Sequence, residues 1–500
     1  MAKIKINKEL LILFAIILVA LVLRLYKIDQ YMTFLGDEGR DAIIVRRLLV
    51  EAHPPLIGPG TSIGQMYLGP LYYYMMAPAL LLANFSPVGP AIQIAILGII
   101  TVAFVWWVGR EWFGKTAGLT SAGLYAISPT VIIYSRSSWN PNIMPFFALL
   151  SIYSIWRVWK YKEFKWLMVL GIAFAFALQS HYLGLLLVPT IFLFWILTYL
   201  EIKKLNGNFL RKSVFGLLIF LGLMSPLLFF DIRHNWMNSQ AIYKFFAVRQ
   251  ETVSIRPWSA IPKMPEILSQ INTSLVAGKN TLMGQILSVG IAAVFVWLVW
   301  LFFKNKKKFS ENNNLTILLF WIGFSLIGLG LYKQQIYDHY FGFVFAAIFL
   351  MMGFMVQKIS EFKIARPPLV LAFIGLIYIN LIVSPLRYSP NHQLERAMEV
   401  AEKIGVESGG EEFNLAVVAE RNYQDGYKYF LLKENKKVIE IDAQRPETIT
   451  KQLFVVCEME PAKCNPTSNP RAEVANFGWS TIENQWTVDG VIIYKLGHSK

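Results

Sequence analysis

Charged residues are scarce in this sequence of 500 residues. Asp, Glu, Lys and Arg together account for 16% of it and hydrophobic residues for 55%, whereas an ordinary soluble domain has about 25% charged residues. This shortage excludes a single large soluble core. It predicts an integral membrane protein with many spanning helices.

Acidic residues are fewer than basic ones, which leaves a formal net charge of +15. Such an excess would suit a nucleic-acid-binding protein if the Lys and Arg residues formed one continuous patch. Here they occur in short clusters between apolar runs, which is typical of the cytoplasmic loops of membrane proteins. The charge distribution therefore argues against nucleic acid as a partner.

Cysteine is almost absent, since the sequence contains only Cys457 and Cys464. If the C-terminal region lies outside the membrane, these two residues could form a disulfide, and two free thiols are the alternative. Neither alternative makes a metal site.

Long apolar runs are what the sequence has in abundance. The N-terminal segment is basic and then apolar, without a small-residue cleavage site, so we interpret it as a retained first span. Runs of spanning length are present at 10–26, 88–109, 116–133, 141–157, 166–182, 184–200, 213–230, 282–303, 315–332, 340–356 and 367–385. These eleven runs predict a polytopic, mainly α-helical membrane bundle.

The basic loops predict the orientation of the bundle. Lys and Arg concentrate in alternate loops and in the N-terminal tail, which places the N-terminus inside and the C-terminus outside. A further apolar segment at 66–83 would invert every later loop if it crossed the membrane. Because it also contains Gly69-Pro70 and Pro78, we interpret it as a re-entrant or juxtamembrane helix on the outer side.

The sequence divides into a membrane domain, 1–385, and a soluble exoplasmic domain, 386–500. The membrane domain has two large outer loops, 27–87 and 231–281. The second domain is predicted to be a small α/β unit, because an amphipathic helix is followed by short strand-like runs. The helix is expected over 391–405 and the strands over 414–420, 437–442, 453–459 and 490–496.

Ionisable residues are nearly missing from the interiors of the apolar runs, with Arg24 as the main exception. Ion-coupled transporters and channels usually carry such groups near the midplane of the membrane. In this sequence they gather at outer helix ends and in outer loops. The distribution favours a site at the outer membrane face.

Asp37 and Glu38 begin a segment that is predicted to form an amphipathic surface helix, "DEGRDAIIVRRLLVEA". Two interpretations stay open. Acids in a first helical turn stabilise the helix dipole by about 0.3–1 kcal/mol, and they can also be catalytic or metal-binding carboxylates. Gly36 and Gly39 flank the pair and would allow a ligand to approach the backbone closely.

Other polar residues lie in the remaining outer segments. Each of them alone is most simply an interface residue, but together they place three of the six His residues at the same face. The set comprises Arg136, Trp139, Asn140, His181, Tyr182, Asp231, Arg233, His234, Lys333, Tyr337, Asp338, His339 and Tyr340. No HExxH-like spacing is present, which argues against a structural zinc site.

A resemblance to a known family follows from three segments and their order. "GDEGRD" beyond the first span, the Pro- and Tyr-rich "GPLYYY", and "HYF" at a late outer helix end are similar to segments of polytopic lipid-dependent glycosyltransferases. The chain resembles the GT-C superfamily, in particular the family 39 group of protein mannosyltransferases and aminoarabinose transferases. The resemblance covers roughly residues 1–385.

The resemblance implies an inverting sugar transfer from a polyprenyl-phosphate-linked donor to an acceptor hydroxyl or amine on the exoplasmic side of the cell membrane. It implies that Asp37 is the base and that Glu38 positions or contacts the acceptor. The leaving phosphate needs cationic and hydroxyl donors. Arg233 is the first candidate, followed by His234, His339 and Tyr340, with His181 and Tyr182 as further donor contacts; other site candidates are Arg40, Asp41, Gln65, Tyr67, Asn140, Tyr337 and Asp338.

The sequence departs from the family pattern in two places. A spacer separates "HPPLIG" from "GPLYYY", so His53 and Gln65 both remain candidates for the usual basic position, and Asn140-Pro141 stands where Asp-Pro is common. No cofactor is predicted with certainty. Asp37 and Glu38 could hold a divalent cation, although a dedicated site would be expected to have more such residues.

Two alternatives belong to other classes. One is a lipid or sugar flippase-type transporter without covalent chemistry, and the other is a polymer ligase with a diphosphate-linked oligosaccharide donor. The acceptor, which could be a protein, a lipid or a glycan, is not predicted. The soluble domain is a candidate for orienting it, because both are expected on the same side of the membrane.

Overall fold

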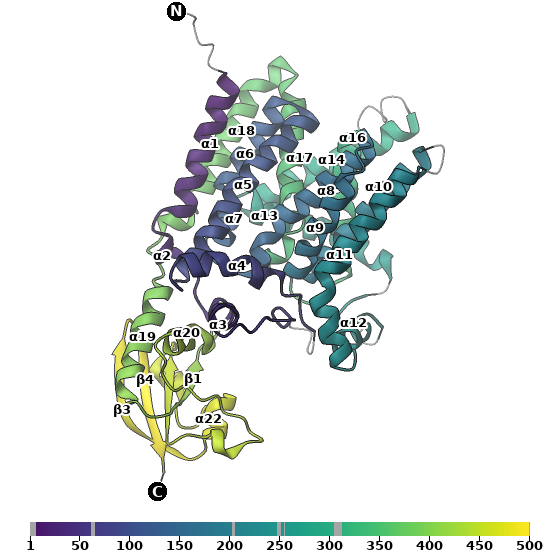
Figure 1. Cartoon of the computed structure of the whole chain (residues 1–500). Coiled ribbons are helices and arrows are strands. Elements are labelled where there is room, and N and C mark those ends of the chain that lie inside the picture. The colour runs from purple at the N-terminus through teal and green to yellow at the C-terminus, as the bar shows by residue number, and fades with distance from the viewer. Residues whose placement is uncertain are drawn as a thin grey trace, which may run out of the picture.

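The computed structural model describes residues 7–61, 66–202, 206–247, 252–254, 256–304 and 313–499. It consists of a bundle of long helices with a smaller domain at one end, and the first and last described residues lie at opposite ends of the molecule (Figure 1). Each predicted apolar run overlaps one of the long helices. These are α1 (Lys8–Leu25), α5 (Val88–Phe113), α6 (Lys115–Ile127), α8 (Met144–Tyr161), α9 (Trp166–Ser180), α10 (Val188–Glu201), α11 (Gly207–Arg233), α14 (Thr281–Lys304), α16 (Asn313–Leu331), α17 (Phe345–Ser360) and α18 (Arg366–Ile382).

The chain is a multi-pass membrane protein. In the described ranges, six helical segments are long and apolar enough to cross a bilayer, and three more helices are apolar but shorter. The six are Val88–Phe113, Tyr182–Glu201, Gly207–Arg233, Thr281–Lys304, Asn313–Leu331 and Lys363–Ile382. The total of eleven crossings and the inside position of the N-terminus stay predictions.

Ion pairs join several helix ends at the end of the bundle farthest from the small domain. Glu9, at the start of α1, pairs with Arg110 at 2.5 Å and with Lys115 at 3.7 Å. Arg157 pairs with Glu111 at 3.3 Å, so the ends of α5 and α8 are also neighbours. The start of α1 and the 110–115 loop therefore lie at the same end, as the loop charges predicted.

Shorter helices gather at the opposite end, towards the small domain (Figure 1). Because α4 has only 12 residues and is about 18 Å long, it is too short to span the hydrocarbon core, which agrees with the interpretation of 66–83 as a helix that does not cross. These helices are α2 (Ile28–Tyr31), α3 (Gly36–Val50), α4 (Leu71–Leu82), α7 (Pro129–Tyr134), α12 (Met237–Ala247) and α13 (Met264–Leu275), with 3₁₀ turns η1 (Asn140–Ile143), η2 (Tyr182–Leu187), η3 (Pro257–Lys263) and η4 (Asp338–Phe341). The remaining 3₁₀ turns are η5 (Lys363–Ala365), η6 (Pro385–Arg387) and η7 (Pro446–Thr448).

Arg24, the main ionisable residue inside an apolar run, stabilises a helix break. Pro129 has no backbone N–H, so the run at 116–133 is divided into α6 and α7 and the carbonyl of Tyr125 loses its usual donor. The fully buried Arg24 guanidinium donates to the carbonyls of Ala126 at 2.9 Å and Tyr125 at 3.4 Å. Arg136 donates in the same way to the carbonyl of Leu23 at the end of α1, at 2.7 Å. Both arginines therefore have structural partners.

The C-terminal domain is a four-stranded sheet in the order β1-β2-β4-β3, with β1 and β2 parallel and the other pairs antiparallel. Its elements are α19 (Gln393–Glu407), β1 (Asn414–Val418), α20 (Asp425–Lys433), β2 (Gln452–Cys457), α21 (Pro461–Cys464), α22 (Ala472–Phe477), β3 (Ser480–Val488) and β4 (Val491–His498). The structure confirms the predicted helix and the strands at 414–420, 453–459 and 490–496.

The predicted strand at 437–442 is wrong. This segment pairs with the sheet only through the bridge between Phe413 and Val438, and then turns away because the Asn414 side chain donates to the carbonyls of Ile439 and Thr448. β3 was not predicted, since an exposed edge strand has little apolar alternation. α20 was also not predicted.

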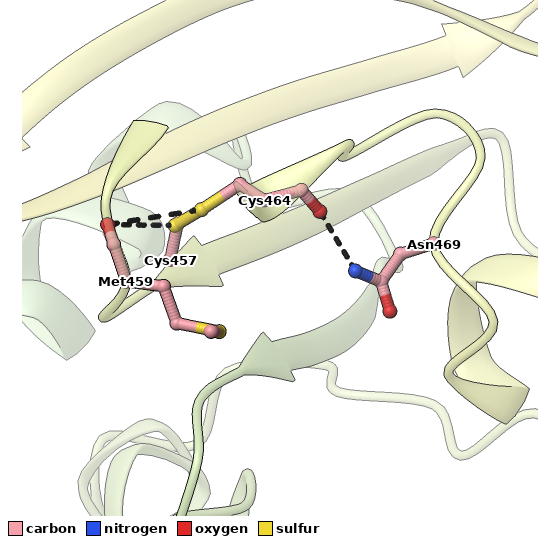
Figure 2. Close-up of a disulfide and its surroundings, with 4 residues drawn as sticks. All are labelled: Cys457, Met459, Cys464 and Asn469. Atoms are coloured by element: carbon pink, nitrogen blue, oxygen red, sulfur yellow. Dashed lines mark hydrogen bonds between the residues drawn. A yellow bond between two sulfur atoms is a disulfide. The ribbon is translucent and has the colours of Figure 1, made fainter. Parts of the chain in front are cut away.

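Cys457 and Cys464 form a disulfide, which decides between the two alternatives left open by the sequence (Figure 2). The bond links the end of β2 to the end of α21, with the Cα atoms 6.0 Å apart. Both residues are buried in the core on one face of the sheet.

The core on the other face of the sheet continues into the membrane-proximal helices. Phe34 packs against the rings of Tyr429 and Phe430 of α20 at centroid distances of 6.2 and 5.5 Å. The Tyr429 hydroxyl donates to the carbonyl of Phe85 at 2.6 Å. The domain is thus docked on α3 to α5 by apolar packing and hydrogen bonds.

Candidate active site

A cavity of about 400 Å³ lies where α3 meets the ends of the long helices nearest the small domain. This volume is in the usual range for small-molecule sites. The cavity has a polar part and an apolar part. The polar lining includes Asp37, Arg40, Thr61, Asn140, His181, Tyr182, Tyr332, His339 and Tyr340, and the apolar lining includes Leu183, Leu185, Leu186, Ile242, Phe245, Val253, Leu329 and Leu331.

Asp37 faces this cavity from the first turn of α3, with 40% of its side chain exposed. Its Oδ1 accepts hydrogen bonds from Arg40 Nη1 at 2.8 Å and from the Tyr423 hydroxyl at 2.6 Å. Both donors that the described residues supply to this carboxylate bond to Oδ1. Oδ2 is therefore left for a donor that enters the cavity.

Arg40 connects the cavity face of α3 with its buried face. Its guanidinium binds Asp37 on one side and Asp41 Oδ1 on the other, through Nε at 3.0 Å and Nη2 at 2.7 Å. Asp41 is completely buried, and this burial raises its pKa to about 6, although the charge of Arg40 opposes the shift. Arg40 thus holds one carboxylate that lines the cavity and one that is buried.

Glu38 is buried and is absent from the cavity lining. Its Oε2 accepts the backbone N–H of Leu35 at 3.0 Å, which satisfies a donor at the N-terminus of α3. Burial raises the pKa of Glu38 to about 7, against the lowering effect of that hydrogen bond. This placement favours a role in helix capping over contact with an acceptor.

Two imidazoles and a tyrosine form an aromatic group on the cavity wall. The ring of His339 lies 4.7 Å from Trp139 and 4.6 Å from Tyr340, and the ring of His181 lies 5.0 Å from Tyr340. His181 Nδ1 accepts the N–H of Leu183 at 3.2 Å, so the neutral ring carries its proton on Nε2. Burial lowers the pKa of His339 to about 4, and the nearby charges of Asp338 and Asp37 oppose this shift.

The structure brings seven of the predicted residues together on the cavity wall. These are Asp37, Arg40, Asn140, His181, Tyr182, His339 and Tyr340. Two of them also join segments of the wall, because Asn140 Nδ2 donates to the carbonyl of Ser180 at 2.7 Å and the Tyr182 hydroxyl donates to the carbonyl of Tyr67.

Seven other candidates lie outside the lining, and Gln65 falls outside the described residues. Arg233 is exposed at the end of α11, and His234 is exposed and stacks on Phe230 at 4.0 Å. Asp338 accepts a hydrogen bond from Ser274 and pairs with Lys279. The rest of the set is Glu38, Asp41, Tyr67 and Tyr337.

A divalent cation does not fit the acidic group on α3. Asp37 and Asp41 are both paired with Arg40, and Glu38 points away from Asp37 into the protein. In the described ranges, no three His, Cys, Asp or Glu side chains gather as potential metal ligands. The reaction proposed below therefore uses protein side chains alone.

Three contributions to the site were not predicted. The apolar wall comes from helix ends whose sequences look like ordinary spans, and Tyr332 follows α16 directly. Tyr423, which bonds to Asp37, comes from the C-terminal domain, 386 residues further along the chain. Gly36 and Gly39 indicated that another group could approach the backbone of α3 closely. In the structure the C-terminal domain lies there, and not a ligand.

Comparisons with known proteins find a family match over part of the chain and a likeness of fold over most of it. Residues 68–230 match a family model described as dolichyl-phosphate-mannose-protein mannosyltransferase. The structure is similar to ArnT from Cupriavidus metallidurans bound to undecaprenyl phosphate, with a TM-score of 0.61 and 11% identity over 97% of each chain. It is also similar to the Archaeoglobus fulgidus oligosaccharyltransferase, with a TM-score of 0.53 and 12% identity over 89% of this chain and 67% of that chain.

The structural likeness gives the fold, and the family match gives the kind of chemistry. The chain is a GT-C-type membrane glycosyltransferase. No curated protein sequence matches it. For a GT-C-type enzyme the flippase-type alternative is not favoured, and the predicted superfamily and fold class are confirmed.

Proposed function

We propose that this GT-C-type enzyme transfers a sugar from a polyprenyl-phosphate donor to an acceptor hydroxyl or amine at the outer face of the cell membrane. The observation that carries the proposal is one cavity whose wall includes Asp37, the His181, His339 and Tyr340 group, and an apolar part formed by helix ends. The similar ArnT structure contains undecaprenyl phosphate, which supports a lipid of this class.

The two parts of the cavity suit the two parts of such a donor. An isoprenoid chain needs apolar contacts, which Leu185, Leu186 and Leu329 offer. The phosphate needs donors, and His181 Nε2, the Tyr340 side chain and Arg40 lie on the polar wall. We place the leaving phosphate among these donors, since positioned hydrogen-bond donors stabilise the charge that develops on it.

In the proposed reaction, the acceptor oxygen or nitrogen attacks the anomeric carbon while Asp37 Oδ2 accepts its proton. The bond between the anomeric carbon and the phosphate oxygen breaks, and the electron pair leaves with the polyprenyl phosphate. A single displacement of this kind inverts the anomeric carbon. Arg40 orients Asp37 through its hydrogen bond to Oδ1.

The test compares Asp37→Asn with the matched variant Glu38→Gln in purified protein supplied with a polyprenyl-monophosphate sugar. Because general-base catalysis contributes about 10²- to 10⁴-fold, Asp37→Asn should lower kcat by that factor while donor binding remains. Glu38→Gln should retain kcat within about twofold, since Glu38 caps α3. Unchanged turnover in Asp37→Asn would remove Asp37 from the mechanism.

A diphosphate-linked oligosaccharide serves as the second donor in the same assay. Turnover with this donor alone would replace the monophosphate proposal by the polymer-ligase alternative. Mass spectrometry of the products identifies the sugar and the acceptor.

A further inference from the structure

We propose that Tyr423 of the C-terminal domain is a positioning residue for Asp37, so that the soluble domain completes the active site. The inference rests on the proposed role of Asp37 as the base. Tyr423 lies in the loop between β1 and α20, and it is absent from the cavity lining. It therefore acts through Asp37 and not on the substrate.

The hydrogen bonds at Asp37 show how the tyrosine would act. The Tyr423 hydroxyl and Arg40 Nη1 reach the same oxygen, Oδ1, at 2.6 and 2.8 Å. Two donors on one oxygen fix the plane of the carboxylate and leave Oδ2 free of both. With Arg40 alone, the carboxylate could rotate about its own axis and exchange its two oxygens.

The backbone of the Tyr423 loop is tied to the start of α3. Asn422 Oδ1 accepts the N–H of Gly36 at 2.9 Å and also the N–H of Tyr423 at 2.9 Å. Asn422 Nδ2 donates to Glu458 at 2.5 Å, so the amide cannot turn over without losing all three bonds. The loop and the first turn of α3 therefore form one unit.

Two glycines of α3 lie where the backbone of this helix and the C-terminal domain are in close contact. A Cβ atom on Gly36 would lie 2.5 Å from the Tyr423 ring, and one on Gly39 would lie 2.3 Å from the carbonyl oxygen of Asp425. Both distances are shorter than a side chain allows. The sequence of α3 is thus fitted to this loop at the turn that carries Asp37.

The hydroxyl of Tyr423 remains a donor. Burial raises the pKa of Tyr423 well above its ordinary value, and the charge of Asp37 raises it further while Arg40 lowers it. A protonated hydroxyl facing an ionised carboxylate makes a charge-assisted hydrogen bond, which is stronger than a neutral one. This excludes Tyr423 as a second base and leaves it the positioning role.

The experiment uses the full-length enzyme with Tyr423→Phe, which removes only the hydroxyl, and Tyr429→Phe as the matched control. The Tyr429 hydroxyl also connects the domain to the membrane region, through the carbonyl of Phe85, but has no bond to Asp37. Tyr423→Phe should lower kcat about 10- to 100-fold, the effect of losing one charge-assisted hydrogen bond in the transition state. The donor KM and the midpoint of thermal unfolding should change little, and Tyr429→Phe should retain kcat.

Three outcomes are decisive. Wild-type kcat in Tyr423→Phe, with Asp37→Asn inactive, overturns the positioning role and leaves the proposed function in place. An equal loss of kcat in both Tyr variants shows that only domain docking matters, which also overturns the inference. Turnover that survives in Asp37→Asn overturns the proposed function itself, and the Tyr423 inference with it.

Discussion

The two faces of α3 have opposite environments, although each carries an acid of the same short segment. Asp37 lies on the cavity face with 40% of its side chain exposed, whereas the neighbouring Glu38 is 6% exposed. One residue along a helix is a rotation of about 100°. Adjacent carboxylates on a helix are therefore unsuited to act as a pair on one ligand, and Asp37 and Glu38 have separate roles.

The two environments also differ in how they affect the carboxylates and the stability of the protein. Asp37 accepts hydrogen bonds from Arg40 and Tyr423 and lies on the cavity wall. Burial raises the pKa of Glu38 to about 7 and that of Asp41 to about 6, which shows that ionised carboxylates are unfavourable on the buried face. The buried acids lower stability at high pH, and the cavity face carries the proposed base.

The largest effect on activity and stability is expected for Arg40, because it pairs with both Asp37 and Asp41. Arg40→Met should lower kcat because Asp37 loses a donor, and should also lower stability because Asp41 is left buried without its ion pair. Removing one partner of a buried pair costs about 3–5 kcal/mol. Because Asp41 can protonate, this cost should be large at pH 8 and small at pH 5, which thermal unfolding in detergent at the two pH values will measure.

The double variant Arg40→Met with Asp41→Asn is the control. It should recover most of the thermal stability at pH 8 and should keep the loss of kcat, since Asp37 is still without Arg40. Recovery of both properties would mean that Arg40 has no effect on Asp37 and would contradict the division between the two faces.

Glu38→Gln should change stability without changing catalysis. The raised pKa means that the contribution of Glu38 is fully present below about pH 4.5 and is lost as pH rises through about 7. Relative to Glu38→Gln, the wild type should therefore lose about 3 kcal/mol in its free energy of unfolding over that window and nothing more above it. The Gln side chain keeps an oxygen for the N–H of Leu35, so the helix cap is preserved.

Unfolding of both proteins from pH 4 to 9 measures this difference directly. A constant difference over the whole range would show that Glu38 is not the titrating group. A kcat that falls as far as in Asp37→Asn would return Glu38 to the catalytic machinery.

The contrast between the faces also explains how far sequence alone could predict this site. Apolar periodicity and loop charge predicted α3 and the gathering of Asp37 with His181 and His339, because these follow from local pattern and from a shared end of the bundle. The rotation of α11 could not be predicted in this way. The span is apolar on every side, and only 11% of it is buried in the protein, so the sequence does not show which side faces the bundle. Arg233, at its end, is exposed and lies outside the cavity lining.

Long-range docking was the second limit. The bond between Tyr423 and Asp37 joins residues 386 positions apart, and nothing local in the loop before α20 distinguishes Tyr423 from Tyr427 or Tyr429. The glycines at 36 and 39 indicated a close approach, but glycine permits any neighbour and cannot identify one. Contacts between domains depend on the shapes of both surfaces, which a single sequence does not give.

Removal of the disulfide should have the smallest effect on stability and activity. It tests whether the residues that support Asp37 include the sheet of the C-terminal domain. Cys457→Ala with Cys464→Ala opens a short loop with a sequence separation of 7, so the chain-entropy model gives a loss of about 2 kcal/mol in unfolding free energy. Glu458, next to Cys457, binds the Asn422 amide that holds the Tyr423 loop, but β2 anchors it from the other side. We therefore expect thermal unfolding to shift and kcat to remain within about twofold. A loss of kcat as large as in Tyr423→Phe would show that the disulfide also fixes the tyrosine, and that the catalytic unit reaches through Glu458 to the sheet.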